Sequence, residues 1–230
     1  PLDVKDVALT FDAGSVDNAA DEILDFLKEK GVKSTFFLTG QFIRNYPETV
    51  KRIAAEGHEI GNHTWSHPHL TTYAENRRHG TLPTITLETL REQFSKTALL
   101  FNTVTGQQMA RLWRAPYGEH NQEILTWAAL AGYRHVGWTG SLSRAESMDT
   151  LDWVADKNSK VYRSAEEIAN KIIAYAKRKK PGANGAIVLM HLGTNRKDDF
   201  PHRKLPEIID ALRKEGYEFV KISEMMKEGL

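Results

Sequence analysis

The sequence of 230 residues contains no cysteine, which excludes disulfide bonds, thiolate metal ligands and a cysteine nucleophile. It also lacks an apolar run long enough to cross a membrane as a helix. Its net charge is only +1 and its basic residues are spread along the chain, so the footprint of a nucleic-acid-binding protein is missing. Neither a signal peptide nor an initiator methionine precedes Pro1, which indicates a mature or trimmed form.

Helical and strand patterns alternate along the chain. Apolar residues recur at helical spacing over residues 20–27, Gly31 ends that helix, and residues 34–38 form a short apolar strand. The same order of helix, glycine and strand returns later in the sequence. We predict further helices at 47–54, 122–130 and 205–214, another that opens at the capping box Ser164-x-x-Glu167, and strands at 6–11, 59–61, 133–136, 186–190 and 217–220.

Strands that alternate with helices predict βαβ units and a parallel sheet covered by helices. Because these strands are short and continuously apolar, they suit a barrel as well as an open sheet. A polar excursion at 73–86 and a long connection at 140–162 interrupt the alternation, but no low-complexity tract marks a domain boundary. We therefore expect a single domain that spans residues 1–230.

Two histidines follow the predicted strand 59–61 at a spacing of four residues. On a helical turn, positions i and i+4 project from one face, so His63 and His67 can converge on one ion. Neutral imidazole is the commonest protein ligand of zinc-like metals. A pair of histidines without metal has the same spacing, so the H-x-x-x-H pattern alone leaves both interpretations open.

Polar residues follow other predicted strands as well. Asp12 follows strand 6–11, Arg114 follows the apolar pair at 112–113, and His191 follows strand 186–190. Each has an ordinary role as a helix cap, an ion-pair partner or a hydrogen-bonded core residue. In parallel α/β folds, however, functional groups collect at the carboxyl ends of strands. A carboxylate, a guanidinium and three imidazoles at such ends together favour an active site.

The segments around these residues resemble a known family. In chain order they are residues 10–14 (Thr-Phe-Asp-Ala-Gly), 63–67 (His-Thr-Trp-Ser-His), 111–118 (Arg-Leu-Trp-Arg-Ala-Pro-Tyr-Gly), 149–153 (Asp-Thr-Leu-Asp-Trp) and 189–191 (Leu-Met-His). They resemble the ordered motifs of the polysaccharide deacetylase family, the carbohydrate esterases built on the NodB homology domain. The resemblance spans about residues 6–225 and implies an α/β fold, a distorted (β/α) barrel with parallel strands and outer helices.

The resemblance implies a metal-dependent hydrolase that removes N-acetyl groups from a polysaccharide containing N-acetylglucosamine, such as peptidoglycan, chitin or a related glycan. It implies a divalent metal, zinc or alternatively cobalt or nickel, on the histidine pair. Asp12 is then the general base, held ionised by Arg114, and His191 is the general acid, with Asp152 tuning its pKa. Such a substrate implies a secreted or cell-envelope location with the signal removed.

The resemblance also implies contacts with the substrate. The backbone N–H of Tyr117, fixed after Pro116, is an oxyanion donor. Trp153 and Leu189 form an apolar slot for the acetyl methyl group, although such residues near strand ends are ordinarily core. Four tryptophans are expected near the cleft, where they suit sugar stacking: Trp65, Trp113, Trp138 and Trp153.

One position departs from the family pattern. Ala13 stands where the family has a second aspartate, which is its third metal ligand, and a methyl group cannot coordinate a cation. Three outcomes are open: Asp12 binds the metal itself, water fills the position, or the ion is held weakly or not at all. Asp17, on the following turn, is another candidate donor.

Alternative functions remain open on the same residues. The fold also suits an O-acetyl esterase acting on xylan-like polymers, or an amidase acting on a small cyclic amide, as in allantoinase-like relatives. A third alternative is a non-catalytic glycan-binding module weakened in metal binding by Ala13. A pure binder needs neither a base nor an acid, so the retention of Asp12 and His191 favours an enzyme.

Overall fold

The computed structural model describes residues 5–14, 16–140, 146–178 and 182–228. Strands and helices alternate over most of this range, as the sequence predicts. The elements are β1 (Asp6–Ala13), α1 (Ala20–Glu29), β2 (Thr35–Leu38), α2 (Gly40–Asn45), α3 (Pro47–Ala55), β3 (Glu59–Asn62), α4 (Tyr73–Asn76), α5 (Leu87–Thr105), β4 (Leu112–Trp113), η1 (Pro116–Gly118), α6 (Gln122–Leu130), β5 (Arg134–His135), α7 (Ala165–Ala176), β6 (Ala186–His191), η2 (Pro201–Lys204), α8 (Leu205–Lys214), β7 (Glu218–Phe219) and α9 (Ile222–Glu228).

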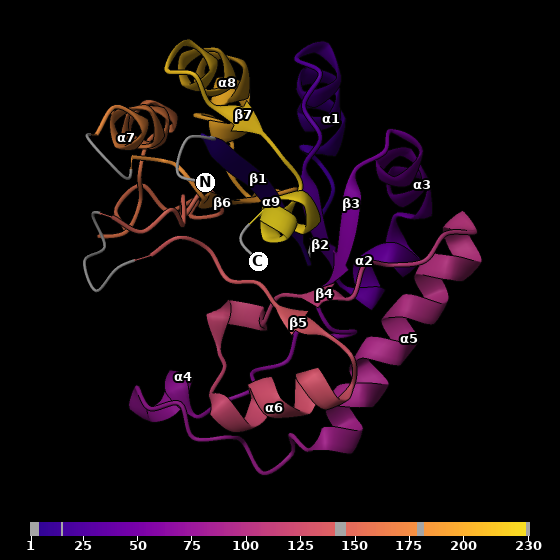
Figure 1. Ribbon diagram of the computed structural model, residues 1–230. Helices are drawn as coiled ribbons and strands as arrows, with labels where there is room; N and C mark the ends of the chain where they lie inside the picture. The colour runs from indigo at the N-terminus through magenta and orange to yellow at the C-terminus, as the bar shows by residue number, and fades with distance from the viewer. Residues whose placement is uncertain (1–4, 15, 141–145, 179–181, 229–230) are drawn as a thin grey trace.

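The strands form one parallel sheet, with helices arranged around it (Figure 1). The strand order is β5-β4-β3-β2-β1-β6, and β7 pairs with the first two residues of β1. No β5–β6 ladder closes the sheet in the described part of the chain. Instead, the segment after β5 runs beside β6: the Thr139 N–H donates to the Ile187 carbonyl (3.0 Å) and the Thr150 N–H to the Leu189 carbonyl (3.2 Å). The predicted fold class, an α/β distorted barrel, is confirmed.

Alternate residues of each strand face opposite sides of the sheet. On β1, one set packs against the helices as part of the large apolar cluster: Val7, Leu9, Phe11 and Ala13. Ala8 has the other parity and belongs to a smaller cluster with residues of other strands and α9, among them Phe37, Leu112, Val136 and Ile222. Asp12 shares the parity of Ala8, so its side chain points into the barrel.

Helix α9 covers the amino ends of the central strands. The Ile222 N–H donates to Thr35 Oγ1 (3.0 Å) at the start of β2, and the Ser223 N–H donates to Glu59 Oε2 (3.2 Å) at the start of β3. In Figure 1 this helix lies across the middle of the barrel. Because one end is covered in this way, the opposite end, formed by the carboxyl termini of the strands, is the end available to a substrate.

Several predicted elements have the bounds that the sequence indicates. Helices α6 and α8 cover 122–130 and 205–214, and Ser164 forms the predicted capping box with Glu167 at the start of α7. The 19-residue helix α5 was not predicted, because its buried stripe is sparse and includes a threonine, Thr97. The excursion at 73–86 contains the short helix α4. Of the connection 140–162, residues 141–145 lie outside the described part. Among the described residues, none of the helices is long and apolar enough to cross a membrane.

Candidate active site

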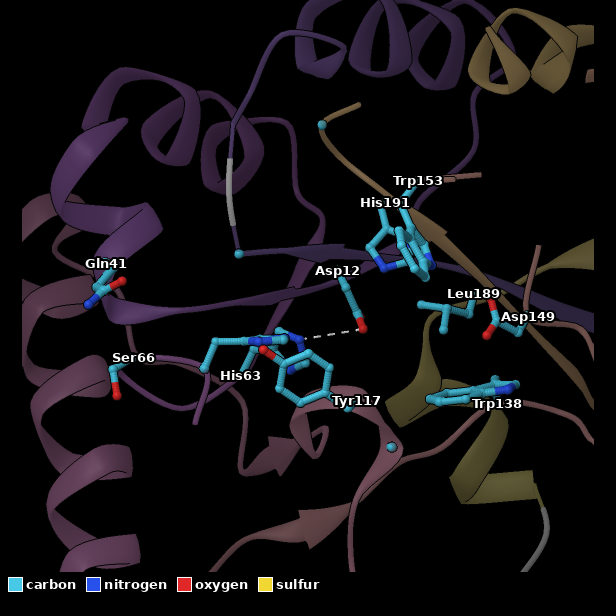
Figure 2. Close-up of a pocket in the computed structure, with 14 residues that line it drawn as sticks. Asp12, Gln41, His63, Ser66, Tyr117, Trp138, Asp149, Trp153, Leu189 and His191 are labelled. Carbon is cyan, nitrogen blue, oxygen red and sulfur yellow. Dashed lines mark ion pairs between the residues drawn. The ribbon is translucent and has the colours of Figure 1, made fainter. Parts of the chain in front are cut away.

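A cavity of about 530 Å³ opens at the carboxyl ends of the strands (Figure 2). It receives side chains from β1, β6 and the segments that follow β3, β4 and β5. All the segments that the sequence singled out therefore meet in one place. The lining residues are Asp12, Gly14, Gln41, His63, Ser66, His67, Tyr117, Gly118, Trp138, Asp149, Trp153, Leu189, His191 and Gly193.

Asp12, which lines this cavity, forms a buried ion pair with Arg114. Arg114 Nη1 donates to Asp12 Oδ1 (2.8 Å) and to Thr10 Oγ1 (2.9 Å), and its other nitrogens donate to the carbonyls of Val136 (3.1 Å) and Gly137 (2.9 Å). Burial alone would raise the pKa of Asp12, but its cationic surroundings, with Arg114 foremost, outweigh it, and the pKa lies below its ordinary value. Asp12 is therefore an ionised carboxylate at neutral pH.

The side chains of His63 and His67 converge as expected, but the helical turn on which that expectation was based is not present. They lie in a loop after β3 in which Thr64 (φ 66°) and His67 (φ 55°) are left-handed. Polar side chains build the loop: Asn62 Oδ1 accepts from the Thr64 N–H (2.9 Å), and Thr64 Oγ1 accepts from the His67 N–H (3.1 Å). The rings of His63 and His67 meet edge to face with centroids 4.7 Å apart.

The donor atoms of this pair fit a divalent metal in part. His63 Nδ1 contacts the Arg114 carbonyl (2.9 Å), which can only accept, so Nδ1 carries the proton and Nε2 is left as a ligand atom. That Nε2 lies 3.6 Å from Asp12 Oδ2. Burial lowers the pKa of His63, and burial together with the neighbouring His63 lowers the pKa of His67 to about 3, so both rings are neutral. Among the described residues, however, no set of three or more His, Asp or Glu side chains is arranged to hold an ion.

Within the part of the chain that the structure describes, neither position 13 nor Asp17 supplies a third ligand. Ala13 is buried in the apolar layer between sheet and helices, on the face of β1 opposite to Asp12. Asp17, the other candidate donor, does not line the cavity, and its Oδ2 accepts from Thr49 Oγ1 (2.7 Å). Of the outcomes that the sequence left open, the geometry favours a site of two imidazoles with the Asp12 carboxylate beside them.

His191 and Asp152 form a second charged pair in this region. Asp152 accepts from both His191 Nδ1 (2.7 Å) and the His191 backbone N–H (2.8 Å), which sets the orientation of the ring. Burial opposes the charged imidazolium, but the charge and hydrogen bond of Asp152 outweigh it, and the pKa of His191 is raised above its ordinary value. The imidazolium form of His191 is therefore stabilised, and the cavity combines an ionised carboxylate with an imidazole whose pKa is raised.

The aromatic wall of the cavity differs from the prediction. Trp153 (51% exposed), Leu189, Tyr117 and Trp138 line it, as Figure 2 shows. Trp113 does not, because it lies on the opposite face of β4 from Leu112 and is fully buried against Phe94 (ring centroids 5.1 Å apart). Trp65 also lies outside the cavity and packs under Lys96.

Three polar residues of the cavity were not assigned from the sequence. Gln41 and Ser66 lie at one end of it, away from Trp153 (Figure 2). Asp149 lies at the other end, near Leu189, and burial raises its pKa. It opens the segment 149–153 that was recognised as a motif, and this is the signal that could have found it. Ser66 lies inside the motif segment 63–67 in the same way, whereas no local pattern marks Gln41.

Comparisons with known proteins agree with this site. Residues 1–136 match the family described as polysaccharide deacetylase, and the chain belongs to that family, a class of hydrolytic enzymes. A peptidoglycan-N-acetylglucosamine deacetylase of Bacillus cereus is 33% identical and covers 99% of this chain and 70% of its own. The structure of PdaA from Bacillus subtilis, a family 4 carbohydrate esterase, matches with a TM-score of 0.77 and 29% identity, over 100% of this chain and 84% of its own.

One structural neighbour is a pseudoenzyme. A family 4 pseudoenzyme from Bacillus anthracis matches with a TM-score of 0.74 and 26% identity, and covers 98% of this chain and 66% of its own. A mutant of it is described as having restored enzymatic activity. The fold thus occurs both with and without catalysis. The function therefore has to be inferred from the residues of the site and not from the fold.

Proposed function

We propose that this chain removes N-acetyl groups from a polysaccharide containing N-acetylglucosamine, with peptidoglycan as the first candidate and chitin or a related glycan as others. The observation that carries the proposal is the pairing at the cavity: an ionised Asp12 held by Arg114, and His191 held by Asp152, which raises the pKa of its ring. The peptidoglycan deacetylases among its relatives support this substrate class. Residues 1–230 would form one catalytic domain acting at the cell envelope.

The base and the acid divide the work of amide hydrolysis. Asp12 takes a proton from water, and the water oxygen bonds to the acetyl carbonyl carbon, whose oxygen becomes an oxyanion. The backbone N–H of Tyr117 donates to that oxyanion. His191 then gives its proton to the amide nitrogen as the carbon–nitrogen bond breaks, and acetate and the sugar amine are released. Trp153 and Leu189 enclose the acetyl methyl group.

The histidine pair would hold the divalent ion, zinc or alternatively cobalt or nickel. When bound, such an ion polarises the carbonyl and acidifies water. The chain prepares the pair for it, because both rings are neutral and His63 Nδ1 is committed to the Arg114 carbonyl, which leaves Nε2 toward Asp12. Structural zinc sites use four protein ligands, while catalytic sites use three and keep a position open. Two histidines with the adjacent Asp12 carboxylate supply three ligands at most, the number used by catalytic zinc sites.

A second candidate is a glycan-binding module without catalysis. Ala13 in place of the family's second aspartate and the pseudoenzyme among the structural neighbours favour it. Against it stand both charged pairs, which cost free energy to bury and which a binder does not need.

Acetate release separates these functions. The purified protein, with zinc, cobalt or nickel added, would be given N-acetylglucosamine oligomers and acetylated xylan in parallel. A cyclic amide would be tested separately by its ring-opened product, because its hydrolysis releases no acetate. The proposal expects acetate from the first substrate, and expects Asp12→Asn and His191→Ala to lower kcat by about 10² to 10⁴. Acetate from xylan alone would identify an O-acetyl esterase. Binding of the oligomers without release under all three metals would identify the binding module.

A further inference from the structure

The turn that carries the oxyanion donor has an unfavourable backbone conformation. Tyr117, a bulky residue, has φ 57° and ψ 9°, in the left-handed region that such residues rarely occupy. Gly118 follows at φ 69°, and a Cβ there would meet the Trp138 ring at 2.6 Å, so Trp138 lies directly against the turn. Such a conformation persists only where surrounding contacts hold it. Trp138 provides these contacts on one side.

On the other side, the Tyr117 ring is held between two histidines. The His69 ring lies flat on it, with centroids 4.1 Å apart and an interplanar angle of 9°. The His67 ring meets it edge to face, at 4.5 Å and 71°. Tyr117 is 57% exposed, so few other contacts restrain its ring. Ring contacts of this kind stabilise beyond the apolar area they bury.

His69 is itself held in place by a buried carboxylate. Glu119 Oε1 accepts from His69 Nδ1 (2.8 Å), and Glu119 Oε2 accepts from the backbone N–H groups of Leu70 (3.0 Å) and Thr71 (3.1 Å). Burial would raise the pKa of Glu119, but these hydrogen bonds outweigh it and lower the pKa. Glu119 is only 2% exposed. It therefore ties the loop after β3 to the turn after β4 and fixes the ring on which Tyr117 rests.

We infer that His69 and Glu119 are positioning residues for the oxyanion donor. Glu119 orients the His69 ring, the ring holds Tyr117 in its left-handed conformation, and the Tyr117 N–H is thereby aimed at the cavity. Neither residue lines the cavity, so neither touches the reacting atoms. This inference rests on the proposed function for its kinetic consequence, but its structural consequence does not depend on catalysis.

The structural consequence can be measured without a substrate. Protein labelled with ¹⁵N-tyrosine gives one amide signal per tyrosine, and the Tyr117 signal is the one that Tyr117→Ala removes. Its heteronuclear NOE reports backbone motion and is insensitive to the loss of a neighbouring ring current. We expect this NOE to fall in His69→Ala and to stay near the wild-type value in His69→Phe, which keeps a flat ring. An unchanged NOE in His69→Ala would overturn the inference.

The kinetic consequence is a split between kcat and KM. In His69→Ala we expect kcat for acetate release to fall by roughly 10- to 10²-fold, up to the cost of a misplacement of about 1 Å, with little change in KM. His69→Phe should recover most of this loss. A change in KM with kcat unaltered would contradict positioning through the stacked ring. Equal losses of kcat in His69→Ala and His69→Phe would contradict it as well.

The chain offers a matched control. His79 lies flat on Tyr73 in the same manner, with centroids 4.6 Å apart and an angle of 15°, but neither residue lines the cavity. His79→Ala should leave both kcat and the Tyr117 NOE unchanged, and an equal effect there would refute a specific role for His69. If the wild-type protein released no acetate, the proposed function would fail, while the NOE comparison would still decide the positioning.

Discussion

Replacing Arg114 with methionine tests how the candidate base is kept ionised. Arg114 is fully buried, and its nitrogens donate to Asp12, Thr10 and the carbonyls of Val136 and Gly137. Methionine keeps the unbranched stem but supplies none of these donors. The substitution therefore leaves a buried carboxylate without its cationic partner, and three other acceptors without the hydrogen bond that Arg114 donates to each of them.

The expected cost follows from that geometry. Removing one partner of a buried ion pair destabilises by about 3–5 kcal/mol, because the remaining charge is uncompensated. In the double variant Arg114→Met/Asp12→Asn, the side chain left at position 12 is neutral. Its loss of unfolding free energy should therefore be smaller than the sum of the losses in the two single variants. The coupling expected for residues in contact is about 0.5–3 kcal/mol. Arg203→Met, which breaks a surface pair with Glu22, is the matched control and should unfold close to wild type.

The loss of stability in Arg114→Met should increase with rising pH. In the wild-type protein, the pKa of Asp12 lies below 3.8, so its ionisation stabilises the fold above that value and this contribution disappears as the pH falls through the lowered pKa. Without Arg114, burial raises the pKa of Asp12, and stability is lost as the pH rises through that raised value. The difference between variant and wild type should thus be larger at about pH 8 than at about pH 5.

Urea unfolding of wild type, the two single variants, the double variant and the control Arg203→Met at both pH values measures these differences, provided that the m-values agree. The same shift in Asp12 should move the acidic limb of kcat/KM for acetate release to higher pH in Arg114→Met. The reasoning would be refuted by single-variant losses that add within about 0.5 kcal/mol, since contacting charges must couple. A loss that shrinks with rising pH would refute it as well.

Three further predictions concern the metal and the acid. His63→Ala and His67→Ala should each abolish acetate release and lower the zinc content that elemental analysis finds in the zinc-loaded protein. Full metal content in either variant would show that the histidine pair is not the metal site. Asp152→Asn should move the alkaline limb of the pH–rate profile to lower pH, because the pKa of His191 falls when its anionic partner is lost, and an unmoved limb would argue against His191 as the acid. Ala13→Asp should lower the melting temperature of the metal-free protein, because a carboxylate would enter an apolar layer. If that carboxylate reaches the ion, zinc should raise the melting temperature of the variant more than that of the wild-type protein. Equal increases with zinc would mean that the side chain at position 13 faces away from the site.

Much of the fold was predictable because its signals are local. The helices at 122–130 and 205–214 and the capping box at Ser164 follow from spacing over one or two turns, and the structure has them at the same residues. The period of two along β1 was also in the sequence, and the same rule would have placed Trp113 opposite to Arg114, away from the cavity. The helix α5 was missed because tertiary packing, rather than a strong apolar stripe, sustains it.

The site was predictable as a set of residues but not as a geometry. The sequence alone determined that Asp12, Arg114 and His191 end separate strands, because strand ends are read from local apolar runs. Only the tertiary structure decided that Arg114 crosses the barrel to Asp12, since β4 and β1 are not neighbours in the sheet and only its curvature brings their ends together. It also decided that a left-handed loop, not a helix, joins the histidines, and that Glu119 reaches His69. The Arg114–Asp12 and Glu119–His69 contacts span about 50 residues or more, and no local propensity encodes them.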